Sequence, residues 1–189
     1  VECTIGQFLS LQFDNQIMQE LGAAASATAE DGADSAANAI DGNPNTYWST
    51  AQRRGGSRHP HELVIHFPQP VQMSGLVLNR QDHRHREGDI RDYVIQISDD
   101  GEQWQAVAEG QLESTFDPQQ IKFGKLVTTH HLKLRALSGF GNDISASLAE
   151  VVLIHAGKAL TSERSEPDTT YGSGTTATEE MFEGTTDTE

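Results

Sequence analysis

The sequence predicts an all-β protein, built as a β-sandwich or jelly roll of antiparallel strands. Three observations lead to this fold class. Several short segments alternate between hydrophobic and polar residues with a period of two, and only one segment has the pattern of a helix. The 17 glycines and the hydrophobic content of 35% suit a loop-rich β architecture better than a helical bundle.

Six segments have the alternation expected of strands, and turn signals separate them. The prolines of residues 67–70 and the Asp-Asp-Gly of residues 99–101 are the clearest turns. The one helix is expected at Ala33–Ile40, and both Trp48 and Trp104 are expected in the core. The predicted strands are Glu62–Phe67, Val71–Leu78, Tyr93–Ile97, Gln120–Phe123, His131–Arg135 and Leu148–Ile154.

The composition divides the chain into three parts. Residues 22–157 carry the strand signal, and about 135 residues suffice for one such core. Residues 1–21 are interpreted as an N-terminal extension or the end of a preceding domain. Residues 158–189 are rich in Thr, Ser, Gly and acids, which predicts a linker or tail because few apolar groups offset the entropy of ordering.

The charge and the lone cysteine exclude several classes of protein. A formal net charge of −15 argues against nucleic acid as a partner, because phosphate binding needs a basic surface. No apolar run approaches the roughly 18 to 20 residues that cross a bilayer, so membrane insertion is not expected. Cys3 is the only cysteine, which excludes an intrachain disulfide framework and a cysteine-based zinc cluster.

The segment from Asn38 to Trp48 combines a carboxylate, a turn glycine, a proline and a hydroxyl in a tight loop. Such a loop directs several oxygens inward, and a hard cation such as calcium takes six to eight oxygen ligands. The alternative is an Asx turn in which Asp41 only caps its own backbone. Both interpretations remain open on this segment alone.

Six ordered motifs resemble those of the coagulation factor V/VIII type C, or discoidin, domain, whose bacterial branch is carbohydrate-binding module family 32. The resemblance covers about residues 22 to 156. It implies a galactose-binding-domain-like jelly roll of about eight strands that carries a structural calcium. The motifs are residues 39–48, 60–67, 78–82, 90–93, 97–104 and 148–151.

Carried over position by position, the resemblance implies a set of calcium ligands that joins the first loop to the last strand. Asp41 and Glu150 would supply carboxylate oxygens, and Thr46 would supply its hydroxyl. Carbonyl oxygens would come from Asn38, Asn43, Thr46 and Ala149. Calcium in such a site would hold the fold together rather than take part in a reaction, because protein ligands leave no position for activated water.

A second group of residues forms a basic, histidine-rich segment. Between residues 51 and 91 lie seven arginines and five of the eight histidines, and against four acids this window has a net charge of +3. Residues 51–59 and 81–89 are expected in two loops, and the resemblance implies that these loops meet and form a sugar site. The candidate ligand-binding residues are Arg53, Arg80, His83, His85, Glu87 and Phe140.

Arg80 stands where family members carry an arginine that hydrogen-bonds sugar hydroxyls, a task that suits the fixed fork of a guanidinium. The alternative is that Arg80 pairs with Asp82, Glu87 or Asp89 across its loop. Phe140, between two glycines, is expected either to project toward a ligand or to fold back onto the sandwich.

The sequence also departs from galactose-binding members of the family. Trp48 is followed by residues 49–52 without the family's histidine and aromatic, and Glu87-Gly88 replaces its Asn-Gly. Because arginine pairs bidentately with carboxylate and sulfate, these departures favour an acidic glycan over a galactose-related one. The alternative is that the arginines only decorate the surface and balance the acidic tail.

The predicted function is a non-catalytic carbohydrate-binding module, and the alternative is a protein-adhesion discoidin domain. Motifs of nucleophilic, metalloprotease and nucleotide-dependent enzymes are absent from the sequence. The resemblance implies a polysaccharide or glycan partner, covalently linked neighbouring domains such as a glycoside hydrolase or polysaccharide lyase, and a secreted bacterial or cell-surface location. His59-Pro60-His61 and His83-Arg84-His85 could each offer two imidazoles to a transition metal, without a convincing third ligand. His130, His131 and His155 are interpreted as ordinary strand positions.

Overall fold

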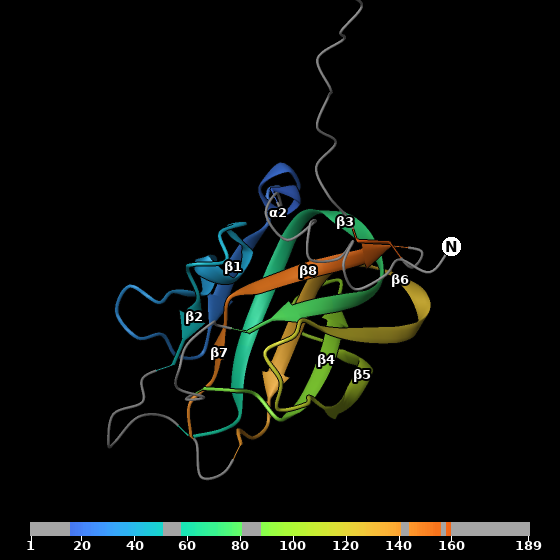
Figure 1. Cartoon of the computed structure of the whole chain (residues 1–189). Coiled ribbons are helices and arrows are strands. Elements are labelled where there is room, and N and C mark those ends of the chain that lie inside the picture. Colours follow the sequence, from blue (N-terminus) through green and yellow to red (C-terminus); the bar gives the residue numbers. More distant parts are fainter. Residues whose placement is uncertain (1–15, 51–57, 81–87, 141–143, 156–157, 160–189) are drawn as a thin grey trace, which may run out of the picture.

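The computed structural model describes residues 16–50, 58–80, 88–140, 144–155 and 158–159 (Figure 1). Among them no helix has the length and apolar character needed to cross a membrane. The elements are α2 (Ile17–Glu20), β1 (Ala24–Ala27), the 3-10 helix η1 (Ala36–Ile40), β2 (Trp48–Ser49), β3 (His61–Asn79), β4 (Asp92–Ser98), β5 (Gln105–Gln111), β6 (Gln119–Ala136), β7 (Ser147–Leu148), β8 (Glu150–His155) and β9 (Lys158–Ala159).

The strands pair antiparallel, in the order β5-β4-β6-β3-β8-β9, with β1 added beside β3 and a separate β2–β7 pair. The long strands β3 and β6 take part in both layers of the sandwich. In one layer, the first half of β3 pairs with β1 on one side and with the second half of β6 on the other. The second half of β6 also pairs with β4, and β4 pairs with β5. The second half of β3 pairs with the first half of β6 and with β8. Figure 1 shows β3 turning from one layer toward β8.

Two irregularities let β3 change layers. Its register against β6 shifts between His66 and Val71, where two prolines lack the N–H groups that a ladder needs, and again between Met73 and Gly75. At Gly75 an added Cβ would collide with the carbonyl oxygen of Ile121. The predicted turn at residues 67–70 is therefore a bend within one strand, and the two segments predicted on either side of it form β3.

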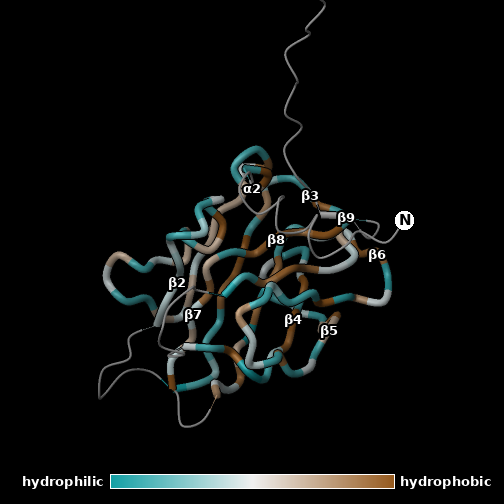
Figure 2. Tube along the Cα trace, viewed as in Figure 1, coloured by the Kyte–Doolittle hydropathy of each residue, from teal (hydrophilic) through white to brown (hydrophobic). Residues whose placement is uncertain are grey.

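The core lies between the two layers and follows the predicted alternation. Leu63, Ile65 and Phe67 of β3 are buried, while the residues between them are partly or fully exposed. Trp48 is fully buried, as predicted, and its indole N–H donates to the carbonyl of Ala29 at 3.0 Å. Figure 2 shows hydrophobic residues along the strands, β8 in particular, and hydrophilic residues in the outer turns.

The predicted all-β, antiparallel fold class is confirmed, and several details differ. The segments predicted at 120–123 and 131–135 form one strand, β6, while β1 and β5 were not predicted. The predicted helix at Ala33–Ile40 is a 3-10 helix of five residues. Trp104 is only half-buried, with its ring under the ammonium of Lys133 rather than in the core, so that prediction was wrong.

Residues before position 22 also contribute to the folded part. Met18 of α2 is fully buried and belongs to the core cluster. The division of the chain into residues 1–21, 22–157 and 158–189 otherwise stays a prediction, since most of the first and last parts lie outside the described residues.

Candidate functional site

A hollow at one end of the sandwich gathers residues from loops and strand ends that are distant in sequence. The hollow is shallow: the room that it leaves for the centres of water-sized spheres is about 20 Å³, and the wider volume of about 340 Å³ that atoms do not fill includes open solvent. Arg80 follows β3 directly, Asp89 precedes β4, and Phe140 follows β6. The described residues that line it are Leu78, Arg80, Asp89, Ile90, Leu112, Glu113, Thr115, Asp117, Gln119, Phe140, Ser147 and Leu148.

Backbone hydrogen bonds fix the segments that carry Asp89 and Phe140. The N–H of Ser147 donates to the carbonyl of Gly88 at 2.7 Å, and Ile90 forms an isolated bridge with Gly139. Gly88 has a φ of +90°, and an added Cβ would lie 2.6 Å from the hydroxyl of Ser147. Only glycine tolerates that conformation and that approach without strain, so this residue sets the position of Asp89.

The guanidinium of Arg80 is held by three neighbours. One terminal nitrogen lies 2.5 Å from Oδ1 of Asp89, and the other donates to the carbonyl of Thr115 at 3.0 Å. The ring of Phe116 lies with its centroid 4.5 Å from the guanidinium carbon, within cation–π range. The side chains of Arg80 and Asp89 are only 12% and 9% exposed, so the pair is largely removed from water.

The loop between β5 and β6 supplies the contacts of Thr115 and Phe116 with Arg80, and hydrogen bonds hold this loop in place. Gln119 bonds the backbone of Glu113 twice, accepting from its N–H at 2.6 Å and donating to its carbonyl at 2.8 Å. The hydroxyl of Thr115 donates to a carboxylate oxygen of Asp117 at 3.0 Å. The loop therefore presents the carbonyl of Thr115 to Arg80 without rearrangement.

The charge of the described lining is negative rather than positive. Asp89, Glu113 and Asp117 supply three carboxylates against the single guanidinium of Arg80. Asp89 already neutralises Arg80 at 2.5 Å. The described part of the hollow therefore offers paired hydrogen-bond donors and acceptors together with an aromatic ring, and it offers no net positive charge.

Of the six predicted ligand-binding residues, Arg80 and Phe140 line the same hollow. Arg53, His83, His85 and Glu87 lie outside the described residues. The alternative in which Arg80 pairs with an acid of its own loop is realised with Asp89.

Sequence reasoning missed the contribution of residues 112–118. Phe116 is 53% exposed, stacks on Arg80 and lies beside the lining residues Thr115 and Asp117. The sequence did contain a signal. Phe116 is an aromatic residue between polar residues and two positions before Pro118, a pattern that indicates a turn rather than a strand.

The loop predicted to bind calcium draws three oxygen groups together. The hydroxyl of Thr46 donates to Oδ2 of Asp41 at 2.7 Å and lies 2.8 Å from the carbonyl oxygen of Asn43. The N–H of Asn43 donates to Oδ1 of Asp41 at 2.8 Å, which is the hydrogen bond of an Asx turn. The loop is thus closed through Asp41 in the way that the alternative interpretation expects.

The second half of the predicted calcium set lies next to this loop. Trp48 pairs with Leu148, which places the end of the loop beside Ala149 and Glu150, and η1 packs against β8. Glu150 is 1% exposed. The amide of Asn38 donates to the carbonyls of Ala33 and Tyr47, both at 3.0 Å. The described residues contain no cluster of three or more His, Cys, Asp or Glu side chains, but the predicted set, made mostly of carbonyl and hydroxyl oxygens, would not form one.

Comparison with known proteins identifies the family. Residues 22–151 match the F5/8 type C domain. The chain belongs to this family. A sialidase of Micromonospora viridifaciens is 32% identical over 118 residues, which cover 61% of this chain and 18% of the sialidase. The chain therefore spans about a fifth of that relative.

Solved structures of family 32 carbohydrate-binding modules share the fold of this F5/8 type C domain. The module of NanJ from C. perfringens, in complex with galactose, has 30% identity and a TM-score of 0.63, covering 69% of this chain and 92% of that one. A module from Clostridium perfringens in complex with GalNAc-β-1,3-galactose has 25% identity and a TM-score of 0.64, covering 70% and 95%. The predicted family and its sandwich fold are confirmed.

Proposed function

We propose that this F5/8 type C domain is a non-catalytic carbohydrate-binding module that holds a galactose-related sugar in the Arg80–Asp89 hollow. The observation that carries the proposal is the buried pair of Arg80 and Asp89 beside Phe140, in a hollow at the end of the sandwich. The modules in complex with galactose and GalNAc-β-1,3-galactose support it, because they share the fold at 30% and 25% identity.

The chemistry of the pair suits sugar hydroxyls, which both donate and accept. Arg80 offers guanidinium N–H groups in a fixed plane, and each terminal nitrogen carries one N–H beyond the one that it directs to Asp89 or Thr115. Asp89 offers carboxylate oxygens, which only accept. The two side chains are already oriented by each other and by Thr115, so binding would cost little further ordering.

The negative lining favours a neutral sugar. Among the described residues of the lining, a uronate or sulfate would approach three carboxylates and one cation, Arg80, which is already paired. The expectation of an acidic glycan rests on Arg53, His83 and His85, which lie outside the described residues, and it stays a prediction. The two ligand classes differ in their response to salt, because screening weakens charge–charge attraction and leaves hydrogen bonds between neutral groups nearly unchanged.

The test is calorimetric titration of the whole chain with galactose, GalNAc-β-1,3-galactose and oligogalacturonate, each at low and at physiological ionic strength. We expect binding of the neutral sugars with dissociation constants from about tens of μM to mM, typical of free energies of roughly −4 to −6 kcal/mol, and little salt dependence. Arg80→Lys keeps the charge but removes the planar fork, and should weaken binding at least tenfold, roughly 1.4 kcal/mol.

A matched control separates loss of the site from loss of the fold. Lys122→Ala changes a cation on the flank of β6, outside the hollow, and should leave affinity unchanged. Oligogalacturonate binding that disappears on adding salt, with no response to galactosides, would establish the acidic alternative. Tight binding to a protein surface that no soluble sugar competes away would establish the adhesion alternative.

The module would work as part of a longer secreted bacterial protein. The sialidase relative is more than five times longer than the matched segment, since the match covers 18% of it. Tethering a weak sugar site to a catalytic domain raises the effective concentration of the substrate. Residues 158–189, with eight acids and one arginine from residue 159 onward, would serve as the linker to such a neighbour.

We also propose that the loop of residues 38–46 holds a structural calcium together with Ala149 and Glu150. A carboxylate oxygen of Asp41 and the carbonyl oxygen of Asn43 each lie within 2.8 Å of the Thr46 hydroxyl, and these are the oxygen donors that calcium takes. Glu150, buried at the start of β8, would add the second carboxylate, and Asn38 would contribute its carbonyl oxygen. The ion would join the loop to the last strand.

Thermal unfolding with and without calcium tests this site. A ligand present at a hundredfold its dissociation constant stabilises by about 2.7 kcal/mol, so calcium should raise Tm by several degrees and a chelator should lower it again. Asp41→Asn should abolish the response, whereas Glu20→Gln, which changes an exposed acid on α2, should keep it. Equal Tm values in calcium and in chelator would contradict the calcium site and favour the alternative, in which Asp41 only closes an Asx turn.

A further inference from the structure

Two histidines face each other on the outer surface of the sandwich, and none of the residues lining the Arg80 hollow takes part. His66 of β3 and His131 of β6 occupy directly opposite positions in the antiparallel pair. Their neighbours Ile65 and Leu132 are buried, while His66 is exposed and His131 half-buried, so both rings lie on the outer face. Their ring centroids are 4.7 Å apart.

That separation fits two imidazoles that ligate one metal ion. Metal–nitrogen bonds to imidazole are about 2.0–2.1 Å long, and the ring centre lies roughly 1.1 Å behind the nitrogen. For nitrogen–metal–nitrogen angles of about 90–110°, the two ring centres would then be about 4.5–5.2 Å apart. The observed 4.7 Å between His66 and His131 falls inside this range.

The two rings also differ from the other described histidines in their hydrogen bonding. His59, His61, His130 and His155 each direct a ring nitrogen to a backbone carbonyl oxygen, at 2.7–3.4 Å. Within the part of the chain that the structure describes, His66 and His131 direct no ring nitrogen to such an acceptor. Their nitrogens therefore remain available to a ligand, whereas the other four rings are engaged in fixing the fold.

Two carboxylates near the pair add negative charge that suits a bound cation. Burial, followed by the neighbouring His66 and His130, lowers the pKa of His131. The carboxylates of Asp99 and Asp100 act on His131 in the opposite direction and contribute negative charge. Hydrogen bonds from the N–H groups of Gln103 and Glu102 and from the hydroxyl of Ser98 lower the pKa of Asp100, which keeps it ionised.

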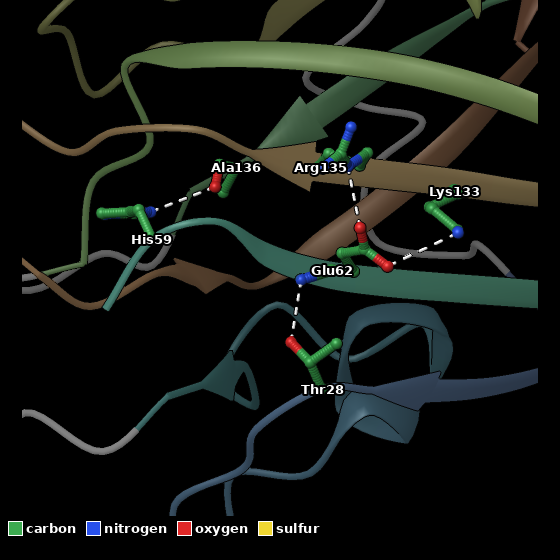
Figure 3. Close-up of polar contacts among 6 residues, drawn as sticks. All are labelled: Thr28, His59, Glu62, Lys133, Arg135 and Ala136. Atoms are coloured by element: carbon green, nitrogen blue, oxygen red, sulfur yellow. Dashed lines mark hydrogen bonds and ion pairs between the residues drawn. The ribbon is translucent and has the colours of Figure 1, made fainter. Parts of the chain in front are cut away.

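A lysine on the same face of β6 is engaged with other groups. Lys133 follows His131 by two residues, but its ammonium lies 3.8 Å from the centre of the Trp104 ring and 3.4 Å from Glu62. Glu62 also accepts from Arg135 at 2.8 Å (Figure 3). This network directs the charges of Lys133 and Arg135 toward Glu62 and Trp104.

We propose that His66 and His131 form a two-histidine chelate for a transition-metal dication such as Cu²⁺, Ni²⁺ or Zn²⁺, with water completing the shell. Imidazole suits these borderline ions, whereas the oxygen groups of the 38–46 loop suit a hard ion, so the two sites differ in chemistry. Bound metal would link the two long strands of the sandwich across their outer face.

Trp104 supplies a readout that does not depend on sugar binding. Its ring centroid lies 6.2 Å from that of His131, and the other tryptophan, Trp48, is fully buried. Titration of the whole chain with CuCl₂, followed by tryptophan fluorescence, should show saturable quenching that Trp104→Phe removes. Because the second imidazole binds intramolecularly, His66→Gln and His131→Gln should each raise the midpoint at least about tenfold.

Two matched controls assign the response to this pair. His155→Gln removes a histidine whose ring bonds the carbonyl of Gln72, and the double variant His83→Gln with His85→Gln removes one of the two histidine pairs that the sequence analysis singled out. Both should keep the wild-type midpoint. His66 is exposed, so His66→Gln should fold normally, and it alone decides the outcome if His131→Gln is unstable. An unchanged midpoint in His66→Gln, or a shift only in the His83/His85 variant, would overturn the proposal.

Discussion

Replacing Asp89 by Asn should destabilise the domain markedly, because it removes the charge that offsets Arg80. The two side chains are 9% and 12% exposed and their charged atoms are 2.5 Å apart. Breaking a buried ion pair by removing one partner costs about 3–5 kcal/mol, and a pair at the floor of an open hollow should lie near the lower end. We expect a loss of about 2–4 kcal/mol and a fall in Tm of roughly 6–12 °C.

Urea unfolding followed by the fluorescence of buried Trp48 measures this loss, and a double-mutant cycle with Arg80→Met isolates the pair. If the two charges interact as the structure indicates, the cycle should return a coupling energy of about 2 kcal/mol or more. Asp117→Asn is the matched control, since it removes an exposed carboxylate of the same hollow that Arg80 does not pair with. Equal stabilities of Asp89→Asn, Asp117→Asn and the wild type would refute the reasoning.

Three further predictions test how the fold supports the site. Gly88→Ala should cost about 1–3 kcal/mol in urea unfolding and weaken sugar binding, because it forces a side chain to a φ of +90° against Ser147; wild-type behaviour would show that Asp89 is positioned by other contacts. Stability should fall as pH drops below about 6.5, because the pKa of His131 is lowered in the folded state and the unfolded chain binds the proton more readily; His131→Gln should flatten this part of the pH profile, and an unchanged slope would contradict the assignment. Ser138→Ala should raise the pKa of Asp92, whose carboxylate accepts from the Ser138 hydroxyl, in an NMR titration of the side chain; an unmoved midpoint would place the cause with Gln111 instead.

The fold class was predictable because alternation reports directly on which side chains are buried. Leu63, Ile65 and Phe67 alternate with polar residues, and the structure buries these three. The continuity of β3 through residues 67–70 was not predictable, since prolines usually end a strand and only pairing with β6 on both sides shows that the chain continues. Strand β5 was missed because it is largely exposed, so its residues show little alternation between hydrophobic and polar.

The candidate site was predictable only in part. Arg80 was found from its position in a family motif and Phe140 from the glycines on either side of it, and the structure brings the two to one hollow. The partner of Arg80 was left open among three acids, because loop conformation decides which carboxylate comes within 2.5 Å. Phe116 was missed because its role depends on the path of a turn between two strands, which periodicity does not reveal. The facing pair of His66 and His131 likewise depends on strand register.

Mapping a galactoside onto the ¹⁵N-labelled whole chain by NMR tests the central claim most directly. The account predicts saturable shifts of the backbone amides of Asp89, Ile90 and Thr115 around the hollow, with none at Ala24–Ala27 of β1 on the far side of β3. Shifts confined to other surfaces, or no shifts at tens of mM sugar, would contradict it.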